Sequence, residues 1–379
     1  MAYQDNLAAL AAEHGLMLPL TERDLDIFGI HFEGSSPLFG TSKNLGSRLF
    51  LQQMAKDSSF IPIHNDVRTQ AEAFFAEHWE ATTRGEVHPI INGFMESLCV
   101  ALLRKSDMQV RINDAWEHRD QVTYDKYAGS ELDNVISAAV MGLDLGTLRV
   151  AEKIDGEWVT NQWLKEACLL YFRLHQNAFV DGAPGLSWDK VPLKGATWSE
   201  SDWEDAGFRL APGAIVRHGA YIAPKGVVLM ANSFVNMGAY VDEYTMVDTG
   251  ARVGSCAQVG KNCHIGAGSG IGGVFEPLQA LPTIIGDDVF MGAMCEVAEG
   301  VVVGDGCVLG MGTLITASTK IFDRETGNIT KGVVPPNSVV VPGSLPAPDG
   351  GPSTHCAIII RQADLETRKR LGINELLRD

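Results

Sequence analysis

The stretch YVDEYTMVDTGARVGSCAQVGKNCHIGAGSGIGG, residues 240–273, repeats with a period of six residues. An aliphatic side chain recurs at one position of the repeat, a small or acidic residue usually follows it, and glycine is frequent elsewhere. A hexapeptide period is typical of a parallel β-helix, in which each repeat forms one short strand and one sharp corner. The aliphatic residue is expected to point into the narrow bore, and a small residue fits best at the corner.

The same period extends in both directions, with a break over residues 272–284 (GGVFEPLQALPTI). Residues 216–321 therefore predict about six coils, each made of three strands. The side chains expected in the bore include one seven-residue step, from Val228 to Val235, and are Val216, Ile222, Val228, Val235, Val241, Val247, Val253, Val259, Ile265, Ile271, Ile285, Met291, Val297, Val303, Leu309, Ile315 and Ile321.

A bore filled with aliphatic side chains leaves no room for a ligand. Any site must lie on the outside of the prism, and the space between packed prisms favours a trimer. The break at 272–284 has two interpretations: an insertion without function, or a loop that reaches over a neighbouring subunit and closes a cleft. Phe275, Leu278 and Leu281 are expected to be exposed in it.

The chain divides into four parts by sequence pattern. Residues 1–145 carry helical spacing, and residues 146–207 contain a hairpin with Asp155-Gly156 at its turn, followed by an amphipathic helix. Residues 208–325 form the β-helix. Residues 326–379 predict the end of a hairpin, a strand within HCAIIIRQAD and a short C-terminal helix.

Composition excludes several classes of protein. The formal net charge is −17, which argues against nucleic acid as a partner because phosphate binding needs a basic surface. No apolar run is long enough to span a membrane, and the N-terminus lacks a signal-peptide pattern. The seven cysteines form no CxxC pair, so we expect free thiols in the cytoplasm and no zinc site.

Several segments closely resemble the tetrahydrodipicolinate N-succinyltransferase family. They include LRVAEKIDGEWVTNQWLKEACLL, GAYVDEYTMVDTGARVGSCAQVGKN, GIGGVFEPLQALPTII, IFDRETGNI, SVVVPGSLP and the ending GINELLRD. The resemblance covers about 130–379, and residues 1 to about 115 match nothing in the family. It implies a left-handed parallel β-helix that forms homotrimers with sites at subunit interfaces. It also implies succinyl-CoA as the acyl donor and 2-amino-6-oxopimelate, the open-chain form of tetrahydrodipicolinate, as the acceptor.

The resemblance assigns roles to three residues. The Asp of the family's MVDT motif is Asp248, the acid of its GARSEV motif is Glu296 in GAMCEV, and the Arg of its GFRV segment is Arg209 in AGFRL. A carboxylate can bind the acceptor ammonium while a second one helps to remove its proton. Asp248 and Glu296 suit these tasks, and Arg209 suits a clamp on an acceptor carboxylate, although a surface arginine is the other reading.

Some positions near the expected site differ from the family. Gly250 stands where MVDTWATVGSC has Trp, Gly266 stands where HLSGGVGIGG has Ser, and Met294 and Cys295 replace the Arg and Ser of GARSEV. These changes leave open a relative that uses acetyl-CoA or another acyl-CoA on a related amino acid, as in a tabtoxin-type β-lactam pathway. Gly250 and Met294 are therefore candidate substrate-binding positions.

Other candidates have competing readings. Asp242 is interpreted as a corner residue that hydrogen-bonds its own turn. His264 is either a structural residue or a catalytic base, and Cys295 could be an acyl-accepting nucleophile. Only His218 and His264 lie in the prism, which disfavours a three-histidine zinc site.

The late coils are expected to hold the acyl-CoA. Small outward residues there would let the pantetheine arm lie close to the backbone, and a lysine could meet phosphate, although a solvated surface charge is the alternative reading for each lysine. The residues concerned are Gly310, Gly312, Ala317, Lys320 and Lys331.

Overall fold

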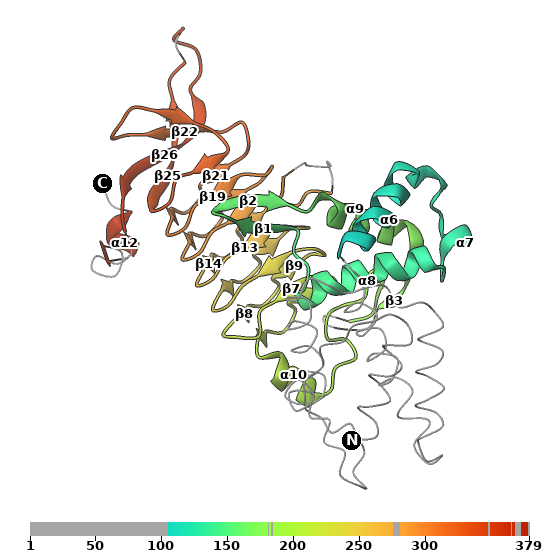
Figure 1. Ribbon diagram of the computed structural model, residues 1–379. Coiled ribbons are helices and arrows are strands. Elements are labelled where there is room, and N and C mark those ends of the chain that lie inside the picture. Colours follow the sequence, from blue (N-terminus) through green and yellow to red (C-terminus); the bar gives the residue numbers. More distant parts are fainter. Residues whose placement is uncertain are drawn as a thin grey trace, which may run out of the picture.

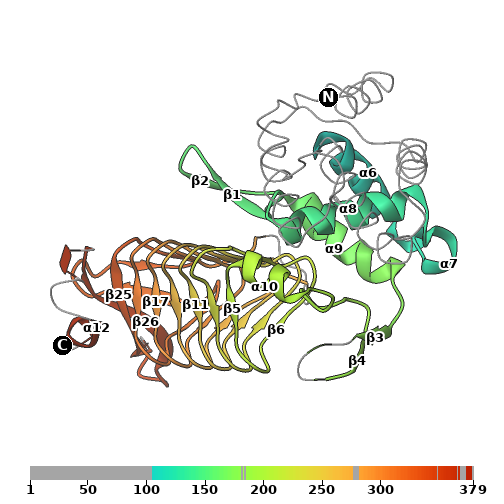
Figure 2. The same cartoon turned by 90° about the horizontal axis from the view of Figure 1, so that it is seen from below.

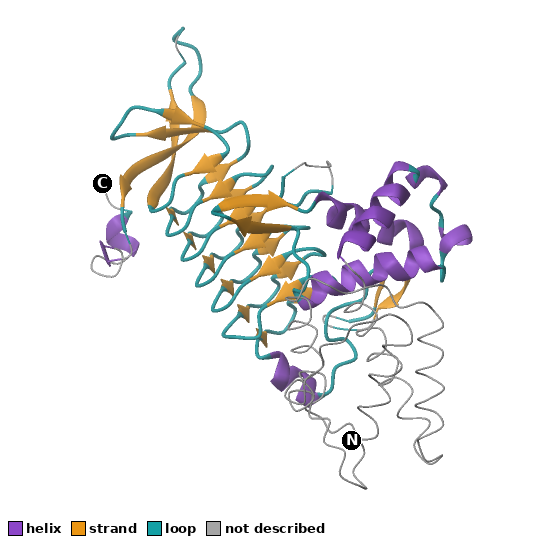
Figure 3. Ribbon diagram, in the orientation of Figure 1, coloured by secondary structure: helices purple, strands orange, loops and turns teal. Residues whose placement is uncertain are grey.

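The computed structural model describes residues 105–379, apart from 181, 183–184, 276–280, 348, 365, 368–372 and 378–379. Its main feature is a prism of stacked coils with a group of helices beside one end (Figure 1). Viewed from below, the coils follow one another as near-parallel loops, and the short strands of successive coils stack into ladders that extend along the prism (Figures 2 and 3). The predicted left-handed parallel β-helix is thus confirmed as the fold.

The prism has three faces, each a parallel ladder of two-residue strands. The hairpin face contains β7 (Tyr221–Ile222), β10 (Tyr240–Val241), β13 (Gln258–Val259), β16 (Ile284–Ile285), β19 (Val302–Val303) and β24 (Val333–Val334). The His264 face contains β5 (Arg209–Leu210), β8 (Val228–Leu229), β11 (Met246–Val247), β14 (His264–Ile265), β17 (Phe290–Met291) and β20 (Val308–Leu309). The Glu296 face contains β6 (Ile215–Val216), β9 (Phe234–Val235), β12 (Arg252–Val253), β15 (Gly270–Ile271), β18 (Glu296–Val297) and β21 (Leu314–Ile315).

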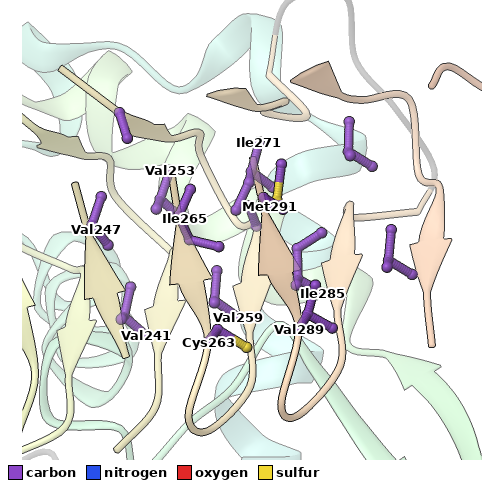
Figure 4. Close-up of a cluster of buried hydrophobic side chains, with 14 of the residues drawn as sticks. Val241, Val247, Val253, Val259, Cys263, Ile265, Ile271, Ile285, Val289 and Met291 are labelled. Atoms are coloured by element: carbon purple, nitrogen blue, oxygen red, sulfur yellow. The ribbon is translucent and has the colours of Figure 1, made fainter. Parts of the chain in front are cut away.

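The second residue of each strand points into the bore (Figure 4). Val253 pairs with Val235 on one side and Ile271 on the other, so aliphatic side chains stack from coil to coil. One prediction is wrong in register: Leu229, not Val228, is the fully buried residue. The seven-residue step falls between Ile222 and Leu229, and the extra residue is accommodated in the corner between them. Val227, Val228 and Leu229 are all aliphatic, so the sequence alone does not indicate which of them points into the bore.

In the described residues between 105 and 174, four helices and a short 3-10 turn, Arg119–Gln121, precede and flank the prism. The helices are α6 (Lys105–Glu117), α7 (Tyr124–Tyr127), α8 (Glu131–Leu145) and α9 (Gln162–Leu174), and α6, α8 and α9 pack on one another around a shared apolar core. Helix α8 begins at Ser130, whose hydroxyl accepts the Asp133 N–H, and ends at Gly146 in the left-handed conformation with φ of 72°. The helices expected within residues 1–104 lie outside the described residues.

The predicted hairpin is formed by β1 (Ala151–Ile154) and β2 (Glu157–Thr160), with Asp155 and Gly156 at positive φ in its turn. It lies over the hairpin face of the prism (Figure 1). Arg149 fixes it there: its Nε donates to Gln258 Oε1 at 2.8 Å, and its guanidinium lies 3.8 Å from the centre of the Tyr240 ring. The middle of this face is therefore covered by the chain itself, whereas Val333 at its far end is 50% exposed.

The excursion from the prism runs from the end of β15 to the start of β16. Phe275 was expected to be exposed, but it is half-buried and packs edge-on against Phe172 of α9, with ring centres 6.1 Å apart. Val274 is fully buried in the helical core. The beginning of the loop thus joins the prism to the helices. Leu281 is exposed, as expected, and Leu278 lies outside the described residues.

The remaining elements close the two ends. The strands β3 (Ala178–Val180) and β4 (Ser187–Asp189) form a second hairpin, and helix α10 (Glu200–Ala206) leads into β5. At the far end, β22 (Lys320–Asp323) and β23 (Ile329–Thr330) form the hairpin expected from sequence, and β25 (Ser338–Leu345), β26 (Thr354–Gln362) and α12 (Ile373–Leu376) follow. Ile321 is buried, but its strand pairs with β26 rather than with the coils. Within the described residues, no helix is both long and apolar enough to cross a membrane.

Candidate active site

Asp248 lies at the corner where the His264 face ends and the Glu296 face begins. Its Oδ1 accepts the Thr249 N–H at 2.7 Å, and its Oδ2 lies 3.8 Å from His264 Nε2 in the next coil. Asp242 makes the same local bond, from the Glu243 N–H at 2.8 Å. The turn hydrogen bond therefore does not distinguish the two acids, whereas the histidine beside Asp248 does.

His264 stands outward on β14 and is held by an aromatic neighbour. Its ring stacks on Phe290 of β17, with centres 5.2 Å apart and planes 16° apart. The histidine and Asp248 side chains are 38% and 28% exposed, so both remain accessible to a ligand. The strands supply this arrangement because His264 and Phe290 are ladder partners on the same face.

Glu296 stands outward on β18 and pairs with Arg252 of β12. The Arg252 Nη2 and Glu296 Oε2 atoms lie 2.5 Å apart. Between them in the ladder is Gly270, which pairs with Arg252 on one side and Glu296 on the other. A Cβ at residue 270 would overlap both Glu296 carboxylate oxygens and lie 2.5 Å from Arg252 Nη2. The missing side chain at Gly270 thus makes room for the ion pair.

The two predicted catalytic acids flank one edge of the prism but do not meet. Among the described residues, no hydrogen bond or ion pair joins Asp248 to Glu296 within a chain. Asp248 faces His264, and Glu296 faces Arg252. A single chain therefore presents two carboxylates on adjacent faces, each with a basic neighbour.

Arg209 lies on the first strand of the His264 face. Its Nη2 is 3.2 Å from Met230 Sδ, and Met230 donates its backbone N–H to Val247 O, directly before Asp248. The exposed guanidinium thus lies toward the same edge as Asp248, on a strand two coils earlier, because β5 pairs with β8 and β8 pairs with β11. This position is compatible with the predicted carboxylate clamp.

Gly250 and Met294 occupy equivalent corner positions two coils apart on this edge. Both have positive φ, 67° and 60°, and Met294 is 65% exposed. A Cβ at Gly250 would meet nothing within 4 Å, so the surface beside Arg252 is open. Met294 covers Gly268 of the intervening coil, where an added Cβ would lie 2.5 Å from its Sδ.

The residues predicted to hold acyl-CoA separate into two groups. Ala317 and Lys320 are exposed, and a Cβ at Gly312 would meet nothing within 4 Å. Lys331 is exposed as well. Gly310 is buried instead, because Leu377 and Val341 of the C-terminal segment cover it. It does not belong to the accessible surface that the other small residues form.

Cys295 is fully buried, and its Sγ donates to Gly310 O at 3.1 Å. Burial raises the pKa of its thiol above the usual value. A buried thiol with a raised pKa is a poor nucleophile, which counts against the acyl-cysteine alternative. In the described part of the chain, no group of three or more His, Cys, Asp or Glu residues is arranged to hold a metal ion.

Sequence reasoning missed Arg252 as a functional candidate. A signal was present: aligning the bore residues Val253, Ile271 and Val297 puts the preceding residues 252, 270 and 296 in one outward column. Arginine, glycine and glutamate in that order allow a charge pair to close over the glycine. The loop at 272–283 lengthens the spacing between residues 270 and 296, so the regular coil spacing does not align these two positions.

Two family models match the chain. One is described as tetrahydrodipicolinate N-succinyltransferase N-terminal and matches residues 107–174. The other is described as hexapeptide repeat of succinyl-transferase and matches residues 257–274 and 282–317. The first match begins before residue 130, so the similarity extends further toward the N-terminus than the sequence motifs indicated.

Curated relatives named 2,3,4,5-tetrahydropyridine-2,6-dicarboxylate N-succinyltransferase are similar to this chain over nearly all of their length. The protein from Caulobacter vibrioides is 55% identical over 279 residues, covering 72% of this chain and 100% of its own. The protein from Parvibaculum lavamentivorans is 55% identical over 282 residues, covering 72% and 99%. That from Paramagnetospirillum magneticum is 56% identical over 279 residues, covering 72% and 98%.

Proposed function

Because the chain belongs to the tetrahydrodipicolinate N-succinyltransferase family, we propose that it transfers the succinyl group of succinyl-CoA to the amine of 2-amino-6-oxopimelate, the open-chain form of tetrahydrodipicolinate. The observation that carries this proposal is identity of about 55% to curated relatives of that name over their full length. The outward acids Asp248 and Glu296 add support, because the amine needs such groups.

In this reaction the amine nitrogen attacks the thioester carbonyl. A C–N bond forms, the C–S bond breaks, and the CoA thiol leaves with a proton. The amine is mostly protonated at neutral pH and must first lose a proton. We assign binding of the ammonium to Glu296 and removal of its proton to Asp248, with His264 beside it to accept the proton. Asp248 Oδ2 is 3.8 Å from His264 Nε2, so the histidine lies beside the proposed base.

We further propose that the working unit is a homotrimer with sites between neighbouring prisms. Asp248 and Glu296 lie on adjacent faces and do not contact each other, so a ligand between two subunits could touch one acid from each. The exposed apolar side chains Met294, Met311 and Leu314 lie along this edge and would be covered by a neighbour.

The donor is proposed to lie along the late coils, with its arm near Gly312 and Ala317 and its phosphates near Lys320. The exposed positions of these residues support this placement. All six cysteines in the described ranges are free, which is consistent with action in the reducing cytoplasm. The acceptor carboxylate is proposed to reach Arg209.

Acetyl-CoA, acting on a related amino acid, is the second candidate donor. Met294 favours it, because an exposed thioether offers no charge to the free carboxylate of a succinyl group. The identity of about 55% to curated N-succinyltransferases favours succinyl-CoA instead. The two donors differ by one carboxylate, so a direct comparison separates them.

The decisive test is CoA-thiol release with purified protein, succinyl-CoA or acetyl-CoA, and 2-aminopimelate as a stable acceptor. We expect turnover with succinyl-CoA. Asp248→Asn and Glu296→Gln should each lower kcat by about 10²- to 10⁴-fold without loss of folding. Turnover with acetyl-CoA alone would replace the proposed donor, and no release with any acyl-CoA would overturn the function.

A further inference from the structure

The Arg252–Glu296 pair offers two charges of opposite sign side by side on an open surface. Arg252 and Glu296 are 52% and 39% exposed, and only one atom of each takes part in their contact. Toward the described part of the chain, Arg252 Nε and Nη1 and Glu296 Oε1 make no hydrogen bond. Three polar atoms are thus available to a ligand.

The surface around the pair is shaped by small residues. Gly270 lies beneath the two side chains, and Gly250, two residues before Arg252, has open space where a side chain would be. Met294 forms the opposite border, two residues before Glu296, with its sulfur over Gly268. A small polar group can therefore approach the pair from the Gly250 side.

An α-amino acid is the chemical complement of such a pair. Its ammonium and carboxylate are attached to the same carbon, so they carry opposite charges at the spacing of neighbouring groups. Glu296 Oε1 would accept hydrogen bonds from the ammonium, and the unused Arg252 N–H groups would donate to the carboxylate. A lysine at residue 252 could not make the same planar two-point contact.

We propose that Arg252 and Glu296 together form the subsite for the α-amino-acid end of the acceptor. Arg252 binds the α-carboxylate and holds Glu296 in place for the ammonium. This inference rests on the proposed function, because it concerns the acceptor of that reaction. It adds a substrate-binding residue and a reason for requiring an α-carboxylate.

The test compares two acceptors that differ only in the α-carboxylate. They are 2-aminopimelate and 6-aminohexanoate, which has the same amine and the same distal carboxylate. Wild type, Arg252→Gln and Arg252→Lys are assayed for kcat and KM, and binding of each acceptor is measured by calorimetry. Lys261→Gln is the matched control, because it breaks an exposed ion pair with Glu243, 3.3 Å long, on another corner.

We expect wild type to prefer 2-aminopimelate, and Arg252→Gln to reduce that preference by about 10- to 100-fold, mainly through KM and binding. Arg252→Lys should retain part of the preference, and Lys261→Gln all of it. An unchanged preference in Arg252→Gln would overturn the subsite, even if activity falls.

Failure of the proposed function has a different signature. If wild type releases no CoA but binds 2-aminopimelate more tightly than 6-aminohexanoate in an Arg252-dependent way, the subsite stands and the reaction does not. If wild type binds the two acceptors equally, the subsite is wrong whatever the activity. Thermal unfolding of each variant shows that the differences do not arise from misfolding.

Discussion

The Lys194 ammonium and the Asp144 carboxylate lie 2.5 Å apart where the helices meet the first coils, with only 6% and 8% of their side chains exposed. Asp144 Oδ1 also accepts the Gly219 N–H at 2.9 Å and lies 3.4 Å from His218 Nδ1. One carboxylate at the end of α8 thus joins the helices, the connecting segment and the prism. A buried network of this kind stabilises only while its members remain paired.

Breaking this pair should be costly. Asp144→Asn removes the carboxylate that lies beside the buried Lys194 ammonium, and we expect a loss of about 3–5 kcal/mol in the free energy of unfolding. The double variant Asp144→Asn/Lys194→Met removes both charges and should lose less than Asp144→Asn alone. Urea unfolding, followed by circular dichroism, measures both. Equal losses in the single and double variants would show that the charge pair is not the cause.

The same pair predicts a pH dependence. Burial alone would raise the pKa of Asp144, but Lys194 and His218 together hold it well below its usual value. A carboxyl whose pKa is lower in the folded state adds stability above its unfolded pKa, near about 4, and loses it as pH falls further. The urea midpoint should therefore drop more steeply below about pH 4 in wild type than in Asp144→Asn/Lys194→Met. Parallel curves would contradict this assignment.

Filling of the bore should dominate the stability of the prism. Ile265 is fully buried and stacks between Val247 and Met291 of adjacent coils. Ile265→Ala removes these contacts and leaves a cavity in a rigid ladder, so we expect a loss of about 2–5 kcal/mol. Ile329→Ala, at a residue 51% exposed, is the matched control and should change stability by less than about 0.5 kcal/mol. Thermal unfolding distinguishes the two, and similar shifts would show that the bore is not the main core.

Sequence periodicity predicted the prism because its requirements are local and repeat in every coil. Each strand needs one aliphatic residue in the bore, and each corner needs a residue that tolerates a sharp turn. The register at Val228 and Leu229 was missed because both side chains satisfy the aliphatic requirement. Which of the two points into the bore depends on the corner in which the chain accommodates an extra residue. The local sequence pattern does not indicate that corner.

The site was harder to predict than the fold. Resemblance made Asp248 and Glu296 candidate acids, but their neighbours His264 and Arg252 depend on which outward residues the coils bring together. Arg252 and Glu296 are 44 residues apart in sequence. Their proximity follows from the coil length and from the size of the loop between them. Contacts between the helices and the prism, such as Arg149 with Gln258, carry no periodic signal at all.

The buried cysteines should be unreactive in the folded protein. Burial raises the pKa of Cys263 to about 12 and that of Cys295 above its usual value, and their side chains are almost inaccessible. Iodoacetamide at pH 8 should leave both unmodified until the protein is unfolded, as read by mass spectrometry. Cys295→Ala should keep the wild-type kcat. Rapid labelling of Cys295 together with inactivation would instead support an acyl-cysteine intermediate.

A substitution at Gly270 tests the pairing of Arg252 with Glu296 and should change the stability of the fold very little. In Gly270→Ala the added methyl group occupies the place of the Glu296 carboxylate, so the ion pair with Arg252 must open. We expect kcat/KM for 2-aminopimelate to fall by about 10- to 100-fold, because the displaced carboxylate no longer receives the ammonium correctly.

The thermal midpoint of Gly270→Ala should change little, since an exposed ion pair contributes about 0–1 kcal/mol. In an Arg252→Gln background the same substitution should cost less than it does in wild type, because the pair is already broken. Independent, fully additive losses in the two variants would show that Arg252 and Glu296 do not act as one unit.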